Sequence, residues 1–196
     1  MGLSEEKKQR KRTRLMDSAF QLFTTQGITK TSIEDIAKMA GVAKGTFYLY
    51  FKDKHDLHQR LIQHKSEQLF QHALACSGYH DQPTAEDKVL VLADDMLAQL
   101  QENRWLLQFF NKNLSWGTFQ SAIEHSDLNY QPIFEEIFGS GVLHDADKRI
   151  EVYIILELIG STCHSVILES NPVDIETFLP YLHRSIRAIM RSFQAA

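Results

Sequence analysis

The chain has 196 residues, enough for one large or two small domains, and its hydrophobic fraction of 43% is typical of a soluble globular protein. The charged start MGLSEEKKQRKRTR lacks the apolar stretch of a secretory signal, and no uninterrupted apolar run approaches the roughly 20 residues of a membrane span. Cys76 and Cys163 are too far apart in sequence to indicate a disulfide framework, so a reducing cytoplasm is the expected compartment.

Charge is distributed unevenly along the chain. The net charge is −4, yet residues 1–60 carry twelve Lys and Arg against seven Asp and Glu, a net of +5. Residues 61–196 carry nine against eighteen, a net of −9. Because nucleic-acid binding depends on a local basic patch, this asymmetry predicts a basic DNA-facing end and an acidic body. The basic run within residues 5–14 is either a solvated tail or a segment that neutralises phosphates.

Two short helices joined by a tight turn are expected within residues 31–54. Ser32 with Asp35 three residues later is a helix-start signature, since a hydroxyl caps the first amides and a carboxylate lies in the first turn. Gly41 follows the last residue of helical periodicity, where a left-handed helix end favours glycine. The first of these helices therefore begins at Ser32 and ends at Gly41.

The second short helix is expected to begin at about Lys44 and to turn Phe47 and Phe51 inward. These rings should pack on an amphipathic helix that begins at Leu15 and ends at Gly27. Three helices of which the second and third are joined by a glycine-containing turn are typical of a helix-turn-helix DNA reader.

One long run resembles the DNA-binding domain of the TetR family of bacterial transcriptional regulators: GITKTSIEDIAKMAGVAKGTFYLYFKDKHDL. The resemblance spans residues 12–57 and rests on the pattern G-x-x-x-T-S-I-x-x-I-A-x-x-A-G-V-x-x-G-T-x-Y-x-Y-F-x-x-K. Ala43 departs from the family, which usually has Ser or Thr there to cap the recognition helix and contact a phosphate. Starting this helix without the cap costs about 1 kcal/mol.

By this resemblance the recognition helix enters the major groove. Gly45 allows the backbone to approach the duplex, and Thr46 is short enough to contact a base or a thymine methyl group. Tyrosine hydroxyls can donate to phosphates, although a tyrosine here can also be half-buried packing. Residues at the start of the preceding helix suit a phosphate, and plain capping is compatible with that role. The expected DNA-contact residues are Thr31, Ser32, Lys44, Gly45, Thr46, Tyr48, Tyr50 and Lys54.

Helical periodicity continues to the carboxyl terminus. A long helix should begin at Asp53 and run to about Cys76, followed by a loop over residues 77–83. Further helices are expected over residues 84–102 and 104–114, and one or two over residues 115–141, broken or kinked near Pro132. Since no stretch of period two with turn signals occurs, the predicted fold class is all-α, with about nine helices.

The two final helices are expected from Asp145 to about Glu169 and over residues 174–193, with a break at Pro180. The first is apolar on more than one face, and residues 160–162 are small enough for another helix to approach closely. In the TetR family the last two helices of two subunits form a four-helix interface, so the resemblance implies a homodimer. A two-fold protein also fits two DNA half-sites about 34–36 Å apart. Alternatively, these helices close the core of a single subunit.

Aromatic residues are concentrated in the middle of the chain. Such residues at helical spacing belong either to a core or to a pocket, and regulators resembling TetR bind small, often apolar molecules in the helical body. The expected ligand-contact residues are Trp105, Gln108, Phe109, Asn113, Trp116, Phe119, His125, Tyr130, Phe134 and His164.

Neither a metal site nor a catalytic site is expected. His55 and His58 share a helix face but lack a third ligand, and the adjacent Cys163 and His164 point about 100° apart on a helix. The chain has no P-loop, G-x-S-x-G, H-E-x-x-H or glycine-rich dinucleotide motif. We therefore expect neither enzymatic activity nor a cofactor.

The sequence predicts two domains: a DNA-binding domain over residues 1–52 and a ligand-binding and dimerisation domain over residues 53–196, connected by the helix over residues 53–76. The predicted function is a cytoplasmic, homodimeric, sequence-specific transcriptional regulator. We expect a repressor that an unknown small molecule releases from a palindromic double-stranded DNA operator. Alternatives are a DNA-binding regulator controlled by a protein partner without a small-molecule effector, and a helical enzyme.

Overall fold

The computed structural model describes residues 3–110, 129–142 and 144–194, and the chain divides into two compact units, Met1–His64 and Lys65–Ala196. The described residues form nine α-helices and one short 3-10 helix and contain no β-strand, which confirms the predicted all-α fold. The division falls inside α4 (Lys54–Cys76), whereas the sequence placed the domain boundary at residue 52. That functional boundary stays a prediction.

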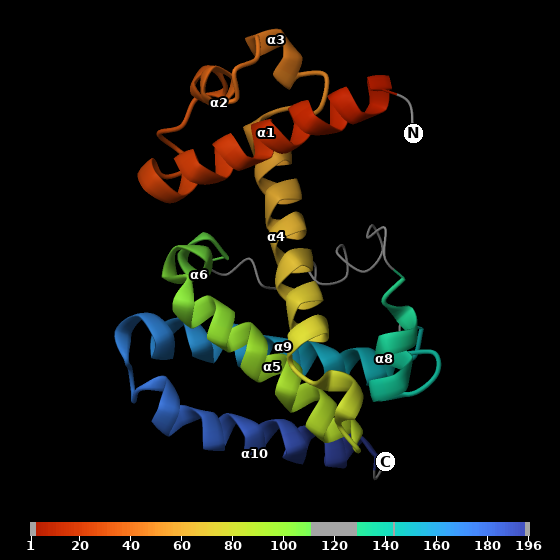
Figure 1. The fold of residues 1–196 in the computed structure, drawn as a ribbon. Helices are drawn as coiled ribbons and strands as arrows, with labels where there is room; N and C mark the ends of the chain where they lie inside the picture. The colour runs from red at the N-terminus through yellow and green to blue at the C-terminus, as the bar shows by residue number, and fades with distance from the viewer. Residues whose placement is uncertain (1–2, 111–128, 143, 195–196) are drawn as a thin grey trace. The chain divides into compact units, whose positions relative to one another are not determined.

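The amino-terminal unit contains α1 (Leu3–Gln26), α2 (Ile33–Met39), α3 (Lys44–Phe47) and the start of α4 (Figure 1). Its core is formed by apolar residues from all four helices and from the segment after α3, namely Leu15, Met16, Ala19, Phe23, Ile36, Ala37, Phe47, Phe51, Leu57 and Leu61. The prediction that Phe47 and Phe51 are core residues is therefore confirmed.

Helix α1 begins at Leu3 and not at Leu15 as predicted. Glu5 and Glu6 lie in its first turn, where carboxylates interact favourably with the helix dipole, and Lys8 pairs with Glu5 at 3.5 Å. The basic run is thus the amino-terminal half of a helix rather than a tail. Periodicity missed this half because it has no apolar face.

Local capping determines the ends of α2. Ser32 and Asp35 form the predicted capping box, with the Asp35 N–H donating to Ser32 Oγ and the Ser32 N–H donating to Asp35 Oδ2, both at 3.1 Å. Gly41 has a φ of +63°, and a Cβ placed there would lie 2.5 Å from Arg14 Nη2. Backbone conformation and crowding therefore both favour glycine at this helix end.

Helix α3 begins at Lys44 as predicted but ends at Phe47, before Tyr50. Ala43 supplies no side-chain cap, so the helix lacks one of the usual stabilising bonds. The chain continues as tight turns, in which the Leu49 N–H donates to Thr46 O at 3.2 Å and the Tyr50 N–H donates to Phe47 O at 3.0 Å. The recognition element is therefore one helical turn followed by a turn segment.

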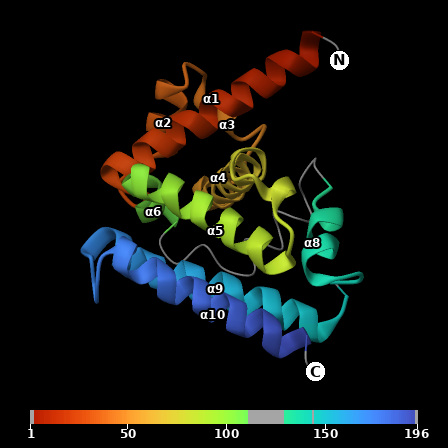
Figure 2. The same ribbon diagram turned by 60° about the horizontal axis from the view of Figure 1, so that its bottom comes forward.

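The carboxy-terminal unit contains the rest of α4, the 3-10 helix η1 (Tyr79–Asp81), α5 (Ala85–Glu102), α6 (Arg104–Phe110), α8 (Gln131–Phe138), α9 (Ala146–Glu169) and α10 (Ile175–Gln194). Helices α9 and α10 run side by side, with α5 packed against both (Figures 1 and 2). Thr84 and Asp145 cap α5 and α9 as the sequence predicts. The predicted loop over residues 77–83 contains η1.

Two prolines behave differently from the prediction. Pro132 lies in the first turn of α8 and begins this helix instead of breaking one, because the first helical N–H groups need no partner there. Pro180 lies inside α10, which continues without a break. The apolar face of α10, with Leu182, Ile186 and Met190 buried, packs along α9 and holds the helix together through the proline.

Helix α9 has an exposed apolar face. Ile150 and Ile154 lie one turn apart with 47% and 37% of their surface exposed, and Tyr153 beside them is 45% exposed. The expectation that α9 is buried nearly all round is thus wrong for the single chain. Among the described residues α9 is also the one helix long and apolar enough to cross a membrane, with 33% of that stretch buried in the protein.

Glu151 is a buried carboxyl group on α9. Burial raises its pKa to about 6 from an ordinary value of 4.5, and Lys148, one turn earlier, only partly opposes this rise. Because folding favours the protonated form, the contribution of Glu151 to stability decreases as the pH rises from about 4.5 to about 6.

Candidate functional site

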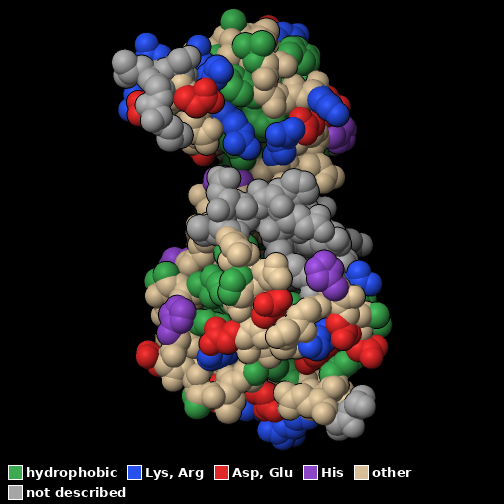
Figure 3. Space-filling view, turned by 90° about the vertical axis from the view of Figure 1, so that its right-hand side faces the viewer, with side chains coloured by type: hydrophobic (Ala, Val, Ile, Leu, Met, Phe, Trp, Pro, Cys, Tyr) green, Lys and Arg blue, Asp and Glu red, His purple; other side chains and the backbone are tan. Residues whose placement is uncertain are grey.

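The predicted DNA-contact residues Lys44, Gly45, Thr46, Tyr48 and Tyr50 lie together on α3 and the turn after it. Lys44 is exposed, and its Nζ lies 3.6 Å from Oε2 of the equally exposed Glu34. An exposed pair of this kind contributes little to stability, so the lysine can exchange its partner for a phosphate. Figure 3 shows Lys and Arg side chains on the visible face of the amino-terminal unit.

The two tyrosines differ in exposure. Tyr48 is 54% exposed, with its ring edge-on to Phe47 at 5.4 Å, whereas Tyr50 is half-buried beside Phe51 at 6.4 Å. Leu49 between them is 78% exposed and was absent from the predicted contacts. Its position off the face shared by Phe47 and Phe51 was the signal that could have identified it. An exposed leucine suits an apolar contact such as a thymine methyl group.

Thr31 and Lys54 bond to the protein itself. Thr31 is 1% exposed; its hydroxyl donates to Gly27 O at 2.8 Å and accepts from Gln26 Nε2 at 3.2 Å. Lys54 Nζ donates to Thr31 O at 2.8 Å and so ties the first turn of α4 to the turn before α2. In this conformation the Thr31 side chain offers no surface to a phosphate, and both residues have a structural role.

Ser32 is exposed at the start of α2, where its hydroxyl donates to Asp35 Oδ2 at 2.6 Å. Hydrogen bonds from the Ser32 side chain and backbone lower the pKa of Asp35. The geometry accounts fully for capping, and a phosphate contact at Ser32 stays a prediction.

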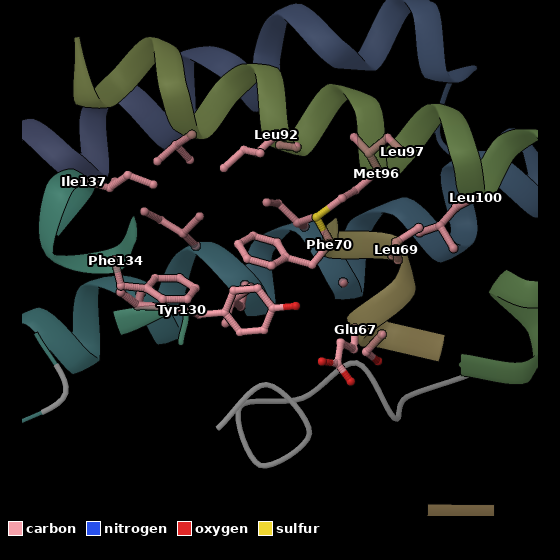
Figure 4. Close-up of a pocket in the computed structure, with 18 of the residues that line it drawn as sticks. Glu67, Leu69, Phe70, Leu92, Met96, Leu97, Leu100, Tyr130, Phe134 and Ile137 are labelled. Carbon is pink, nitrogen blue, oxygen red and sulfur yellow. The ribbon is translucent and has the colours of Figure 1, made fainter. Parts of the chain in front are cut away.

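The carboxy-terminal unit contains a cavity of about 150 Å³ between α4, α5, α8 and α9 (Figure 4). Its lining is almost entirely apolar, and α5 contributes the largest share. The described lining residues are Ser66, Glu67, Leu69, Phe70, Val89, Leu92, Ala93, Met96, Leu97, Leu100, Tyr130, Phe134, Ile137, Phe138, Val152, Ile155, Leu156, Ile159 and Gly160. Gly160 therefore faces the cavity and not, as predicted, an approaching helix.

Two of the predicted ligand residues, Tyr130 and Phe134, line this cavity. The other described candidates do not: Trp105 and Gln108 are exposed, Phe109 is buried elsewhere, and His164 is half-buried on α9. The four remaining candidates, Asn113, Trp116, Phe119 and His125, lie outside the described residues.

An aromatic cluster forms one wall of the cavity. The Phe70 ring lies edge-on to Tyr130 at 5.2 Å and stacks on Phe134 at 5.7 Å (Figure 4). These are favourable ring geometries, and they join α4 to α8. The sequence placed Phe70 on the inward face of α4, but nothing in the sequence paired it with residues sixty positions later.

A buried polar cluster holds α8 against η1 and α5. The fully buried Tyr79 donates its hydroxyl proton to Glu136 Oε2 at 2.7 Å, and Lys88 Nζ binds Glu136 Oε1. The bonds from Lys88 and then Tyr79 lower the pKa of Glu136, whereas burial and this carboxylate raise the pKa of Tyr79. Because Glu136 lies between cavity residues of α8, the cluster sets the position of that cavity wall.

Comparisons with known proteins agree with this arrangement. The family model described as bacterial regulatory proteins, tetR family, matches residues 15–61. An HTH-type transcriptional regulator of Staphylococcus aureus strain USA300 is 28% identical over 177 residues, covering 87% of this chain and 89% of that protein. The regulator AcrR of Shigella flexneri is 44% identical over 54 residues, covering 28% of this chain and 25% of AcrR. The chain belongs to the TetR family.

Solved structures share the fold of this TetR-family chain. The transcriptional regulator FadR of Bacillus subtilis, in complex with stearoyl-CoA, has a TM-score of 0.65 at 20% identity and covers 89% of this chain and 96% of its own. FadR of Bacillus halodurans has a TM-score of 0.63 at 20% identity, covering 90% and 94%. The chain is a DNA-binding transcriptional regulator. In the described part of this TetR-family chain, no three His, Cys, Asp or Glu residues could hold a metal ion.

Proposed function

We propose that the protein is a homodimeric repressor that is released from a palindromic operator when a small apolar molecule binds in the cavity of its carboxy-terminal unit. The cavity is the observation that carries this proposal. A DNA-binding regulator needs no internal apolar cavity for DNA recognition, and interiors are normally packed without voids of this size. The stearoyl-CoA bound to Bacillus subtilis FadR supports the idea that a body of this fold takes up an effector.

Helix α4 is the element that can transmit the effect of a ligand. Its residues Ser66–Phe70 line the cavity, and its first turn is tied by Lys54 to the backbone of Thr31 before α2. A ligand that prefers one position of Phe70 therefore biases the same helix that supports the DNA-binding unit. A tenfold change in operator affinity needs a difference of about 1.4 kcal/mol in ligand affinity between the two states.

An operator-release assay tests this function. Operator duplexes are first selected from a random DNA pool, and their affinity for the purified protein is then measured against fractions of a cell extract. We expect one fraction to lower the affinity at least tenfold, and its active molecule to co-purify with the protein. Met96→Trp, which fills the cavity, should bind DNA and lose the response, whereas Met96→Leu should keep it. A lack of response to every fraction would support control by a protein partner instead.

Among the proposed DNA contacts, Gly45 gives a separable prediction. A Cβ added at Gly45 meets no atom within 4 Å, so the protein itself does not need glycine here, and a helical glycine costs about 0.5–1 kcal/mol relative to alanine. We expect Gly45→Ala to raise the free energy of unfolding slightly while lowering operator affinity about tenfold, because the duplex backbone needs the space.

Chemical denaturation and DNA titration of the same sample measure both effects of Gly45→Ala. Gly41→Ala is the matched control, since the positive φ and the contact with Arg14 make it destabilising. Unchanged DNA affinity in Gly45→Ala would contradict a close approach of DNA at this position.

The proposed dimer uses the exposed faces of α9 and α10. Ile150, Tyr153 and Ile154 on α9 and Tyr181 on α10 are large apolar side chains exposed in the single chain. The opposite side of α10 is bound to α5, with Arg187 Nη2 2.8 Å from Asp87 Oδ1 and His183 Nε2 2.6 Å from Asp94 Oδ1. A second copy covering the apolar face explains why a helix of a DNA-binding protein is apolar on its exposed side.

A further inference from the structure

Tyr130 presents a buried hydroxyl group that no described residue binds. The side chain is 3% exposed and lines the cavity, and its hydroxyl has no hydrogen-bond partner in the described part of the chain. In Figure 4 the oxygen lies on the side of the ring that faces Glu67 and α4. A buried hydroxyl without a partner costs about 1–3 kcal/mol, so its presence in an apolar wall indicates a partner that binds there.

Ser66 is a second hydroxyl of this kind in the lining. It lies on α4 one turn before Phe70, whose ring contacts Tyr130, and its Oγ is also buried without a partner among the described residues. Other helical hydroxyls of the chain bond back to the carbonyl four residues earlier, as Thr24 does to Phe20 O and Ser185 to Tyr181 O. Ser66 does not use this option, and its hydroxyl is available to a ligand.

The size and walls of the cavity limit the ligand. A dry apolar cavity of about 150 Å³ holds a single aromatic ring such as benzene. Phe70, Tyr130 and Phe134 offer ring edges and faces suited to another ring. A long acyl chain with a coenzyme head is larger than this space.

The charges of the lining limit the ligand further. Glu67 is the one charged side chain among the described lining residues, and none of them is Lys, Arg or His. A carboxylate buried here would meet a negative neighbour and no described cation, which is strongly unfavourable. An uncharged polar group, by contrast, needs only the two hydroxyls.

We propose that this cavity binds an uncharged molecule of one aromatic ring bearing a single hydroxyl group, with the ring against Phe70 and Phe134 and the hydroxyl bonded to Tyr130 and Ser66. The proposal rests on the proposed function, because it names the class of effector for the same cavity. Tyr130 and Ser66 are then the residues that select the polar group, while the apolar lining selects only size.

Benzyl alcohol, toluene and benzoate form a matched probe series for nuclear magnetic resonance titrations of the full chain. We expect benzyl alcohol to bind about tenfold more tightly than toluene, and benzoate more weakly than both. Tyr130→Phe and Ser66→Ala should each reduce the advantage of the alcohol over toluene to threefold or less. Ser77→Ala is the control, since Ser77 Oγ is likewise buried without a described partner but lies outside the lining.

The stability of the variants guards against a folding artefact. Removing a hydroxyl that has no partner should leave the unfolding temperature of Tyr130→Phe unchanged or higher. Preferential binding of benzoate or of benzylamine, equal binding of benzyl alcohol and toluene, or an unchanged preference in both variants would overturn the proposal.

Operator affinity measured in the same samples separates the two hypotheses. Hydroxyl-dependent binding without any change in DNA affinity contradicts the proposed function but not the ligand class. Release from DNA by a different molecule in the cavity contradicts the ligand class but not the proposed function.

Discussion

Replacing both Lys44 and Tyr48 by alanine is expected to weaken operator binding roughly a hundredfold at moderate salt. Both side chains are more than half exposed on the recognition segment and bury nothing in the core, so the unfolding temperature should stay the same. Loss of a phosphate contact also lowers the salt dependence of binding, by about one in the slope of log affinity against log salt for each contact. Titrations of the selected operator at several salt concentrations measure both quantities.

Two single variants act as controls for this result. Glu34→Ala removes the acidic partner 3.6 Å from Lys44 and should raise operator affinity about threefold, because an acidic neighbour repels phosphate. Lys65→Ala removes a lysine from the acidic carboxy-terminal unit and should change neither affinity nor slope. A double variant that binds the operator as tightly as the parent protein would show that DNA recognition lies elsewhere.

Replacing Ile150 by glutamate is expected to convert the protein into monomers and to weaken binding to the palindromic operator at least a hundredfold. Ile150 is 47% exposed in the single chain, so a charge there is tolerated in a monomer. In a two-fold interface the same charge is buried and faces its copy, which is strongly unfavourable. Two half-site contacts then no longer act together, and affinity falls towards that of one half-site.

Sedimentation velocity measures the oligomeric state, and DNA titration measures the affinity of Ile150→Glu. Val173→Glu is the matched control, because Val173 is 36% exposed in the segment between α9 and α10 and outside both helices. A dimer that persists in Ile150→Glu, or a parent protein that sediments as a monomer, would contradict the proposed interface.

Most helix boundaries follow from local sequence. Capping pairs such as Ser32 with Asp35 and Thr84 with Asp87 act within one turn, so the residues that form the bonds are neighbours in the chain. The same locality explains why the start of α9 at Asp145 and the end of α4 at Cys76 were predicted correctly. Prediction failed where the local signal was weak or ambiguous, as in the charged first half of α1 and at Pro180 in α10.

Site residues were predicted less evenly. The segment from Lys44 to Tyr50 could be identified because a contiguous motif carries it, although Leu49 was missed. Lys54 was assigned to DNA, but in the structure it binds a carbonyl twenty-three residues earlier in the chain, a partner that periodicity cannot reveal. The aromatic residues of the body gave no signal that separated the exposed Trp105 from the cavity residue Tyr130.

The sequence by itself determined that this protein is all-helical, that its amino-terminal third reads DNA, and where most helices begin and end. Only the tertiary structure decided that Tyr130, Phe134 and Phe70 meet around a cavity, and that Tyr79, Lys88 and Glu136 hold its wall. The reason is physical: capping and periodicity act over a few residues, whereas a cavity and a buried polar cluster depend on how distant helices pack.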